Sequence, residues 1–141
     1  MSSSKIKVLI VDGFSNHLWR LNTALLRGLL EPTDLFEISV STSPPTAESS
    51  GWDIWRPRFS DYDVVIQTCT DIFGGPSWPE EVRTAFEDFV RKGGGVYVFH
   101  AGNSAFPNWA GYNEIIGIGW RTSQQGIALH VTDVTVKLPC P

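Results

Sequence analysis

Apolar and polar residues alternate along the chain in a way that predicts four strands within the first hundred residues. Residues 6–11 form an almost continuous apolar run, which is typical of a strand buried on both faces of a parallel sheet. Residues 36–42 alternate between apolar and polar side chains, so they predict a strand nearer the edge of that sheet. Two further apolar runs, at residues 62–69 and 96–100, predict the remaining strands.

The first helix is predicted from about residue 17 to residue 31. Its apolar residues recur at spacings of three and four, which predicts a buried stripe that Leu26 and Leu30 widen. The stripe itself consists of Leu18, Leu21, Leu25 and Leu29. Ser15 or Asn16 is expected to cap the helix, and Pro32 is expected to end it.

The second helix lies between the third and fourth predicted strands. Ser77 and Glu80 have the spacing of a capping box, which predicts that the helix begins there. Three glycines at positions 93–95 are expected to stop it. Its predicted buried stripe is Val82, Phe86, Phe89 and Val90.

This order of elements predicts an α/β fold of the flavodoxin-like, doubly wound type, a three-layer sandwich with a mainly parallel sheet. The simplest strand order is 2-1-3-4. Residues 43–58 are expected to form a long loop with a short helical turn at residues 52–55. Toward the end of the chain, residues 109–116 predict a short helix and residues 127–138 a strand or hairpin.

Composition narrows the class of protein. The 141 residues correspond to a single domain, and 15 acidic against 11 basic residues give a formal net charge of −4. We therefore expect no nucleic-acid partner, since the basic surface such a partner requires is absent. The apolar runs are too short to span a membrane, and we expect no secretory signal. Cys69 and Cys140 cannot form a disulfide framework, so a cytoplasmic location is expected.

Polar residues follow the predicted strands at the edge of the sheet where parallel α/β proteins bind ligands. Two of the three histidines of the chain are among them. The candidates are Asp12, Asn16, His17, Asp71, His100 and Asn103. Each also has a simpler interpretation, such as a loop hydrogen bond for Asp12 or a core histidine for His100. Cys69 lies inside an apolar strand, which favours a buried structural cysteine.

These residue types suit two kinds of chemistry. His17 and His100, with Asp71, are candidate catalytic groups for general acid–base chemistry. The two histidines are alternatively candidate ligands of a divalent ion such as zinc, together with Asp12 or Asp71. Aromatic faces beside a polar cleft suit sugar rings, and the chain has six tryptophans, all of which have core packing as the alternative.

Several segments together resemble one family. They are residues 7–17, 77–80, 89–103, 105–109, 112–113 and 117–121, and the resemblance extends to about residue 126. On these segments the chain is similar to the ThuA-like (trehalose-utilisation) family of the class I glutamine amidotransferase-like superfamily. The resemblance implies a flavodoxin-like fold and a role in carbohydrate utilisation, on disaccharides or their 3-keto derivatives.

The resemblance also assigns site residues. His17 and His100 correspond to the two histidines that the family places at this edge, with Asn103 beside the second. Asp12, Asn16, Asn103 and Trp109 are expected to bind the substrate. In the amidotransferase relatives the turn after the fourth strand carries a nucleophilic cysteine, but residues 99–103 hold no cysteine or serine. Glutaminase chemistry is therefore not expected.

Two departures from the family pattern keep a second hypothesis open. Leu18 stands where family members commonly carry an acidic or amide residue, and the chain is expected to be truncated or divergent after about residue 126. The leading hypothesis is a sugar-metabolising protein whose partner is a small sugar. The alternative is a non-catalytic binding or interaction module, with a homo-oligomer as one way to cover an apolar surface. Flavin binding is disfavoured because no phosphate loop is found.

Overall fold

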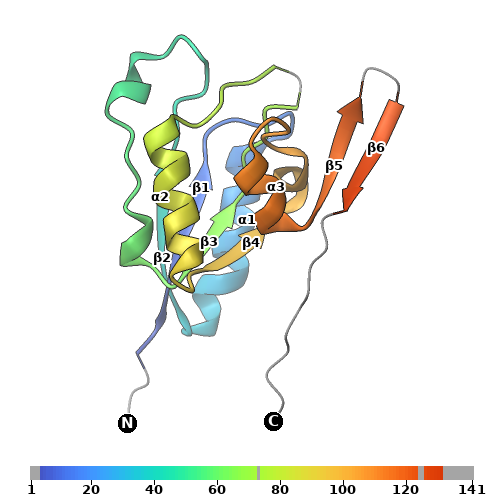
Figure 1. The fold of residues 1–141 in the computed structure, drawn as a ribbon. Coiled ribbons are helices and arrows are strands. Elements are labelled where there is room, and N and C mark those ends of the chain that lie inside the picture. The colour runs from blue at the N-terminus through green and yellow to red at the C-terminus, as the bar shows by residue number, and fades with distance from the viewer. Residues whose placement is uncertain (1–3, 73, 124–125, 132–141) are drawn as a thin grey trace.

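The computed structural model describes residues 4–72, 74–123 and 126–131, which are organised around a four-stranded sheet (Figure 1). The strands are β1 (Ile6–Asp12), β2 (Phe36–Thr42), β3 (Val64–Gln67) and β4 (Gly95–Val98). Their order is β2-β1-β3-β4 and every neighbouring pair is parallel. The predicted order and fold class are confirmed, although β3 and β4 are shorter than expected.

Two apolar clusters, one on each face of the sheet, produce three layers. Successive residues of a strand point to opposite faces, so β1 contributes Leu9 and Val11 to one cluster and Val8 and Ile10 to the other. The helices α2 (Glu80–Arg91) and α3 (Ala110–Ile116) cover the first face, and α1 (Trp19–Leu30) covers the second (Figure 1). Burial of β1 on both faces explains its nearly continuous apolar sequence.

The helix α1 buries a different face from the one predicted. Leu26 is its buried residue and Leu30 packs beside it, against Val8 and Ile10 of the sheet. The four residues of the predicted stripe are instead exposed, namely Leu18, Leu21, Leu25 and Leu29. Because leucines occupy much of the circumference of α1, their spacing alone could not identify the side that faces the sheet. The expected homo-oligomer stays a prediction.

Both predicted helix caps are wrong. The helix α1 begins at Trp19 without a side-chain cap, and the Ser15 hydroxyl accepts a hydrogen bond from the His17 amide instead. The helix α2 begins after Pro79, again without a side-chain cap. Burial of Trp78 in the core places the chain there, which overrides the local capping signal. The predicted buried stripe of α2 is confirmed at Val82, Phe86 and Phe89, with Val90 packed against the same cluster.

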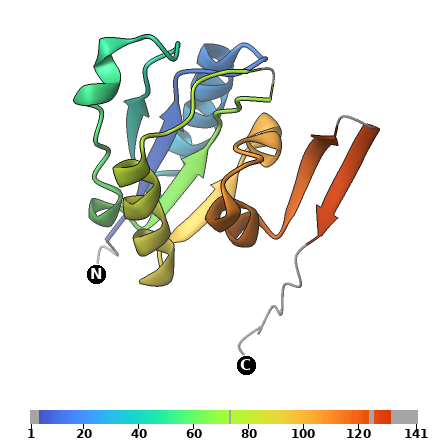
Figure 2. The ribbon, with the colours of Figure 1, turned by 45° about the horizontal axis from the view of Figure 1, so that its top comes forward.

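The segments outside the sheet agree with the expectations in part. The long loop contains a short helical turn at Ser50–Asp53, two residues earlier than predicted. The predicted short helix is α3, and it leads into an antiparallel hairpin of β5 (Ile118–Ser123) and β6 (Gly126–Val131). This hairpin lies beside the parallel sheet rather than in it (Figure 2). The predicted continuation to residue 138 lies outside the described residues.

The helices of the described part of the chain are short. The longest, α1 and α2, have 12 residues each. A membrane-spanning helix needs about 20 predominantly apolar residues. Among the described residues, no helix is long and apolar enough to cross a membrane.

Two neighbouring leucines in α1 differ in exposure, so replacing each with alanine should lower the free energy of unfolding by different amounts. Leu26 is 6% exposed and Leu25 is 52% exposed. Leu26→Ala should lower the free energy of unfolding by about 2–5 kcal/mol, because it leaves a cavity in the core. The matched control Leu25→Ala should cost less than about 1 kcal/mol. Urea denaturation of both variants measures the difference, and equal costs would contradict the observed orientation of α1.

Candidate functional site

The turn after β1 carries Asn16 and His17 to the carboxyl edge of the sheet. Gly13, at φ 131°, begins this turn in a conformation that other residues rarely adopt. A Cβ atom at this position would lie 2.2 Å from the Ser43 carbonyl oxygen, so the close approach of the two segments requires glycine. The Ser15 hydroxyl then accepts the His17 amide hydrogen at 3.1 Å. This local hydrogen bond orients the segment that presents His17.

The turn after β4 presents His100. Residues His100–Ser104 form one short 3-10 helix, and His100 adopts φ 48°. A left-handed backbone costs an L-residue roughly 1–2 kcal/mol, and such conformations cluster at functional sites. Enzymes of the α/β-hydrolase fold use a similarly strained strand-to-helix turn to expose a nucleophile. Here the turn exposes an imidazole.

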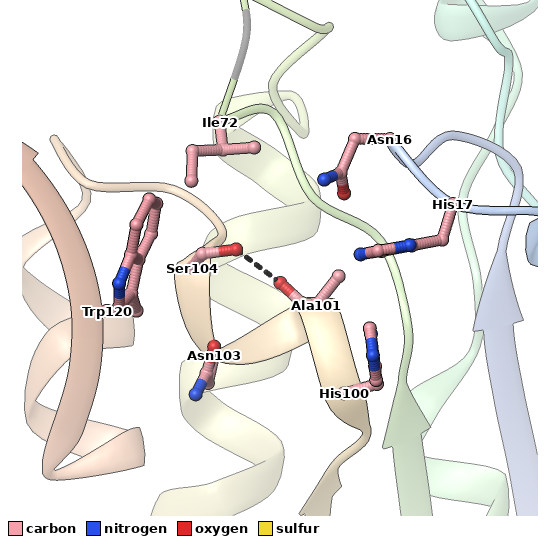
Figure 3. A pocket seen from close by; sticks show the side chains of 8 residues that line it. All are labelled: Asn16, His17, Ile72, His100, Ala101, Asn103, Ser104 and Trp120. Atoms are coloured by element: carbon pink, nitrogen blue, oxygen red, sulfur yellow. Dashed lines mark hydrogen bonds between the residues drawn. The ribbon is translucent and has the colours of Figure 1, made fainter.

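The structure brings the two predicted histidines together. Their ring centroids lie 4.4 Å apart with the planes at 87°, an edge-to-face contact between a loop that follows β1 and a turn that follows β4 (Figure 3). Both rings border a cavity of about 480 Å³. Eighty-two residues separate the histidines in sequence, so the parallel sheet is what makes them neighbours.

The cavity has polar and apolar sides. Asn16 and Asn103, both predicted as binding residues, line it with the histidines. Trp120 of β5 faces it from the opposite side (Figure 3). The remaining lining residues are Ile72, Ala101 and Ser104. Sequence reasoning did not assign Trp120 to the site, although this residue lies in one of the segments that resemble the family.

Three other predicted site residues do not line this cavity. Asp12 is 1% exposed, and its carboxylate accepts a hydrogen bond from the Thr23 hydroxyl of α1. The Asp71 carboxylate accepts the Phe106 amide hydrogen at 2.6 Å. Trp109 is 6% exposed, and its indole donates to Glu87 at 2.7 Å. Its burial leaves no exposed ring face for a sugar, so the structure gives Trp109 a packing position instead.

The described part of the chain supplies two ligands for the predicted metal site. His17 and His100 supply two imidazoles, whereas zinc sites in proteins use three or four protein ligands. Among the described residues, no group of three or more histidine, cysteine, aspartate or glutamate side chains could hold a metal ion. Metal ligation by His17 and His100 stays a prediction, and the chemistry that the described residues supply is that of two imidazoles.

Cys69 is buried, as its apolar sequence context predicts. Burial raises the pKa of its thiol from 9.0 to about 12, since the charged thiolate would lose its hydration. Hydrogen bonding to the Phe14 backbone and to Ser43 only partly offsets this effect. A thiol that stays protonated and shielded is a poor nucleophile.

Comparisons with known proteins identify relatives. The family described as ThuA, trehalose utilisation, matches residues 7–139. A crystal structure of a ThuA-like protein from Parabacteroides merdae superimposes with a TM-score of 0.76 at 32% sequence identity. The match covers 83% of this chain and 40% of that chain, so the aligned region is less than half of the related protein. No curated protein matches the chain.

The backbone of His100 predicts an unusual order of stability for two variants. His100→Gly and His100→Ala both remove the imidazole, but only glycine adopts φ 48° without strain. The glycine variant should therefore be more stable than the alanine variant by about 1 kcal/mol. Thermal and urea denaturation measure the difference. An alanine variant at least as stable as the glycine variant would show that the turn is not strained.

The buried thiol predicts slow alkylation. In a Cys140→Ser variant, Cys69 should resist iodoacetamide at pH 8 and react fully in urea, which mass spectrometry detects. The unfolded thiol loses its proton near its ordinary pKa of 9.0 and the folded one only near 12. The contribution of this group to folding stability should therefore fall as pH rises through that window. Rapid labelling of the folded protein at pH 8 would contradict the burial.

Proposed function

Because the chain belongs to the ThuA family, described as trehalose utilisation, we propose that it acts in carbohydrate utilisation by binding a sugar between His17, His100 and Trp120. The substrate class we propose is trehalose or a related disaccharide, including a 3-keto derivative. The observation that carries the proposal is the contact between two imidazoles at the edge of one cavity.

The lining of the cavity supports a polar ring-shaped ligand. Its volume of about 480 Å³ lies within the range of small-molecule sites, which is roughly 300–1,000 Å³. The amides of Asn16 and Asn103 can each donate to and accept from sugar hydroxyls. Trp120, across from them, offers an apolar ring surface to the C–H face of a sugar (Figure 3).

The chemistry we propose is proton transfer by the two imidazoles. An imidazole changes charge near neutral pH, so it can serve either as a base or as an acid. With a 3-keto-sugar, one neutral imidazole takes the proton from the carbon beside the carbonyl. The other, protonated, donates to the carbonyl oxygen, which yields an enediol and exchanges the charges of the two rings. The two ring centroids are 4.4 Å apart in an edge-to-face contact, so one substrate can reach both rings.

A non-catalytic binding module is the second candidate. The aligned region spans 40% of the related crystal structure, so residues outside it contribute most of that protein. On this second proposal, the cavity bordered by Asn16, Asn103 and Trp120 binds a sugar without turnover. Binding without proton exchange would favour the module, whereas exchange of the proton beside the carbonyl would favour the enzyme.

The proposal predicts that both histidines are required for proton exchange. His17→Gln and His100→Gln should each slow solvent deuterium incorporation into a 3-keto-disaccharide by about 10²-fold or more. Proton NMR of the sugar measures this rate. The control Tyr97→Phe, which alters an exposed residue of β4, should leave it unchanged.

Circular dichroism establishes that each variant is folded. Unchanged exchange in both glutamine variants would refute acid–base roles for the two histidines. Calorimetry with trehalose and its keto derivative measures binding to the unaltered protein. The proposed substrate class would be refuted if the unaltered protein showed neither binding by calorimetry nor exchange by NMR.

A further inference from the structure

The turn that carries His100 is attached to the core through the hydroxyl of Tyr112. This tyrosine, on α3, has no exposed surface. Its hydroxyl donates to the Gly102 carbonyl oxygen at 2.7 Å and accepts from the Gln67 side-chain amide at 3.1 Å. The hydroxyl therefore joins the end of β3 to the middle of the His100–Ser104 turn.

The direction of these hydrogen bonds is determined by Gln67. The oxygen of its side chain accepts from the Cys69 amide, and its nitrogen donates to the Cys69 carbonyl at 3.1 Å. The side-chain nitrogen can only donate, so the Tyr112 oxygen must act as the acceptor toward it. The proton of the tyrosine hydroxyl is consequently left for the Gly102 carbonyl.

A second buried pair holds the preceding carbonyl. The Ser104 hydroxyl donates to the Ala101 carbonyl oxygen at 2.8 Å and lies 3.2 Å from the Thr70 hydroxyl. At Gly102, a Cβ atom would lie 2.6 Å from the Gln67 carbonyl oxygen, so the turn lies directly against β3. Two consecutive peptide groups after His100 are thus held by polar side chains in the interior.

The conformation of His100 requires this support. A residue at φ 48° persists only where the surrounding structure over-determines it. The position of the His100 ring against His17 follows from the backbone of the turn, and that backbone is held at the Ala101 and Gly102 carbonyls. A small rotation of the turn would separate the two imidazoles.

We propose that Tyr112 is a positioning residue, whose buried hydroxyl holds the His100 turn in place and thereby sets the His100 ring against His17. The proposal rests on the proposed function only for its consequence in turnover. Its structural part concerns the geometry of two imidazoles and can be tested without a substrate.

Removal of the hydroxyl alone tests the proposal. Tyr112→Phe keeps the ring that packs 5.2 Å from Phe106 and 5.4 Å from Trp109. The matched control is Tyr62→Phe, because Tyr62 packs against the same cluster but precedes β3 at the opposite end of the sheet. Imidazole NMR of protein labelled with ¹⁵N-histidine reports the ring shifts and the cross-relaxation between His17 and His100.

We expect Tyr112→Phe to shift the His100 ring resonances and to weaken its cross-relaxation with His17, while Tyr62→Phe changes neither. In the deuterium-exchange assay, kcat should fall by up to about 100-fold with a smaller change in KM, because Asn16 and Trp120, which lie outside the turn, still bind the sugar. A loss of stability alone would not move the ring resonances of a folded variant.

A second variant tests the proposal if Tyr112→Phe does not fold. Gln67→Met keeps the Tyr112 hydroxyl but removes the hydrogen bond that it accepts and that orients it toward the Gly102 carbonyl, so this variant should shift the His100 resonances in the same direction. The proposal is overturned if the folded variants retain the ring shifts and cross-relaxation of the unaltered protein. If the unaltered protein exchanges no sugar proton, the proposed proton transfer fails, yet the NMR comparison still decides the role of Tyr112.

Discussion

Parallel pairing of β1, β3 and β4 is the constraint on which the rest of the site depends. Val11 pairs with Gln67, and Gln67 pairs with Val98, so three segments far apart in sequence leave the sheet at the same edge. His17 follows β1 and His100 follows β4, and only this register brings their rings within 4.4 Å. The apolar clusters on the two faces stabilise the pairing, because the central strands β1 and β3 bury side chains on both sides.

Several polar side chains near the site hold the surrounding backbone and helices in place and do not line the cavity. Asp71 holds the Phe106 amide, and Asp12 holds the Thr23 hydroxyl at the start of α1. Tyr112 and Gln67 lie beneath the His100 turn, and their polar groups are surrounded by an apolar interior rich in aromatic side chains. Buried polar groups of this kind are stable only when each has a partner, so they specify one arrangement of the turn above them.

The sequence predicted the sheet well because burial on both faces produces a distinctive apolar run, and it predicted the buried side of α2 because charged residues occupy the opposite side. It failed for α1, where leucines occupy several sides, and for the cap at Ser77, where burial of Trp78 decides the start of the helix. The meeting of His17 and His100 was predictable from topology. The positions of Trp120 and Asp71 depend on turns and on a hairpin outside the sheet, which local patterns do not encode.

The central claim is that one sugar contacts both imidazoles. Titration of the ¹⁵N-histidine-labelled protein with a 3-keto-disaccharide, followed by NMR of the ring nitrogens, tests this claim most directly. The account predicts that the His17 and His100 resonances shift together and saturate with a single dissociation constant, because both rings border the same cavity. Saturable binding that leaves both resonances in place would contradict it.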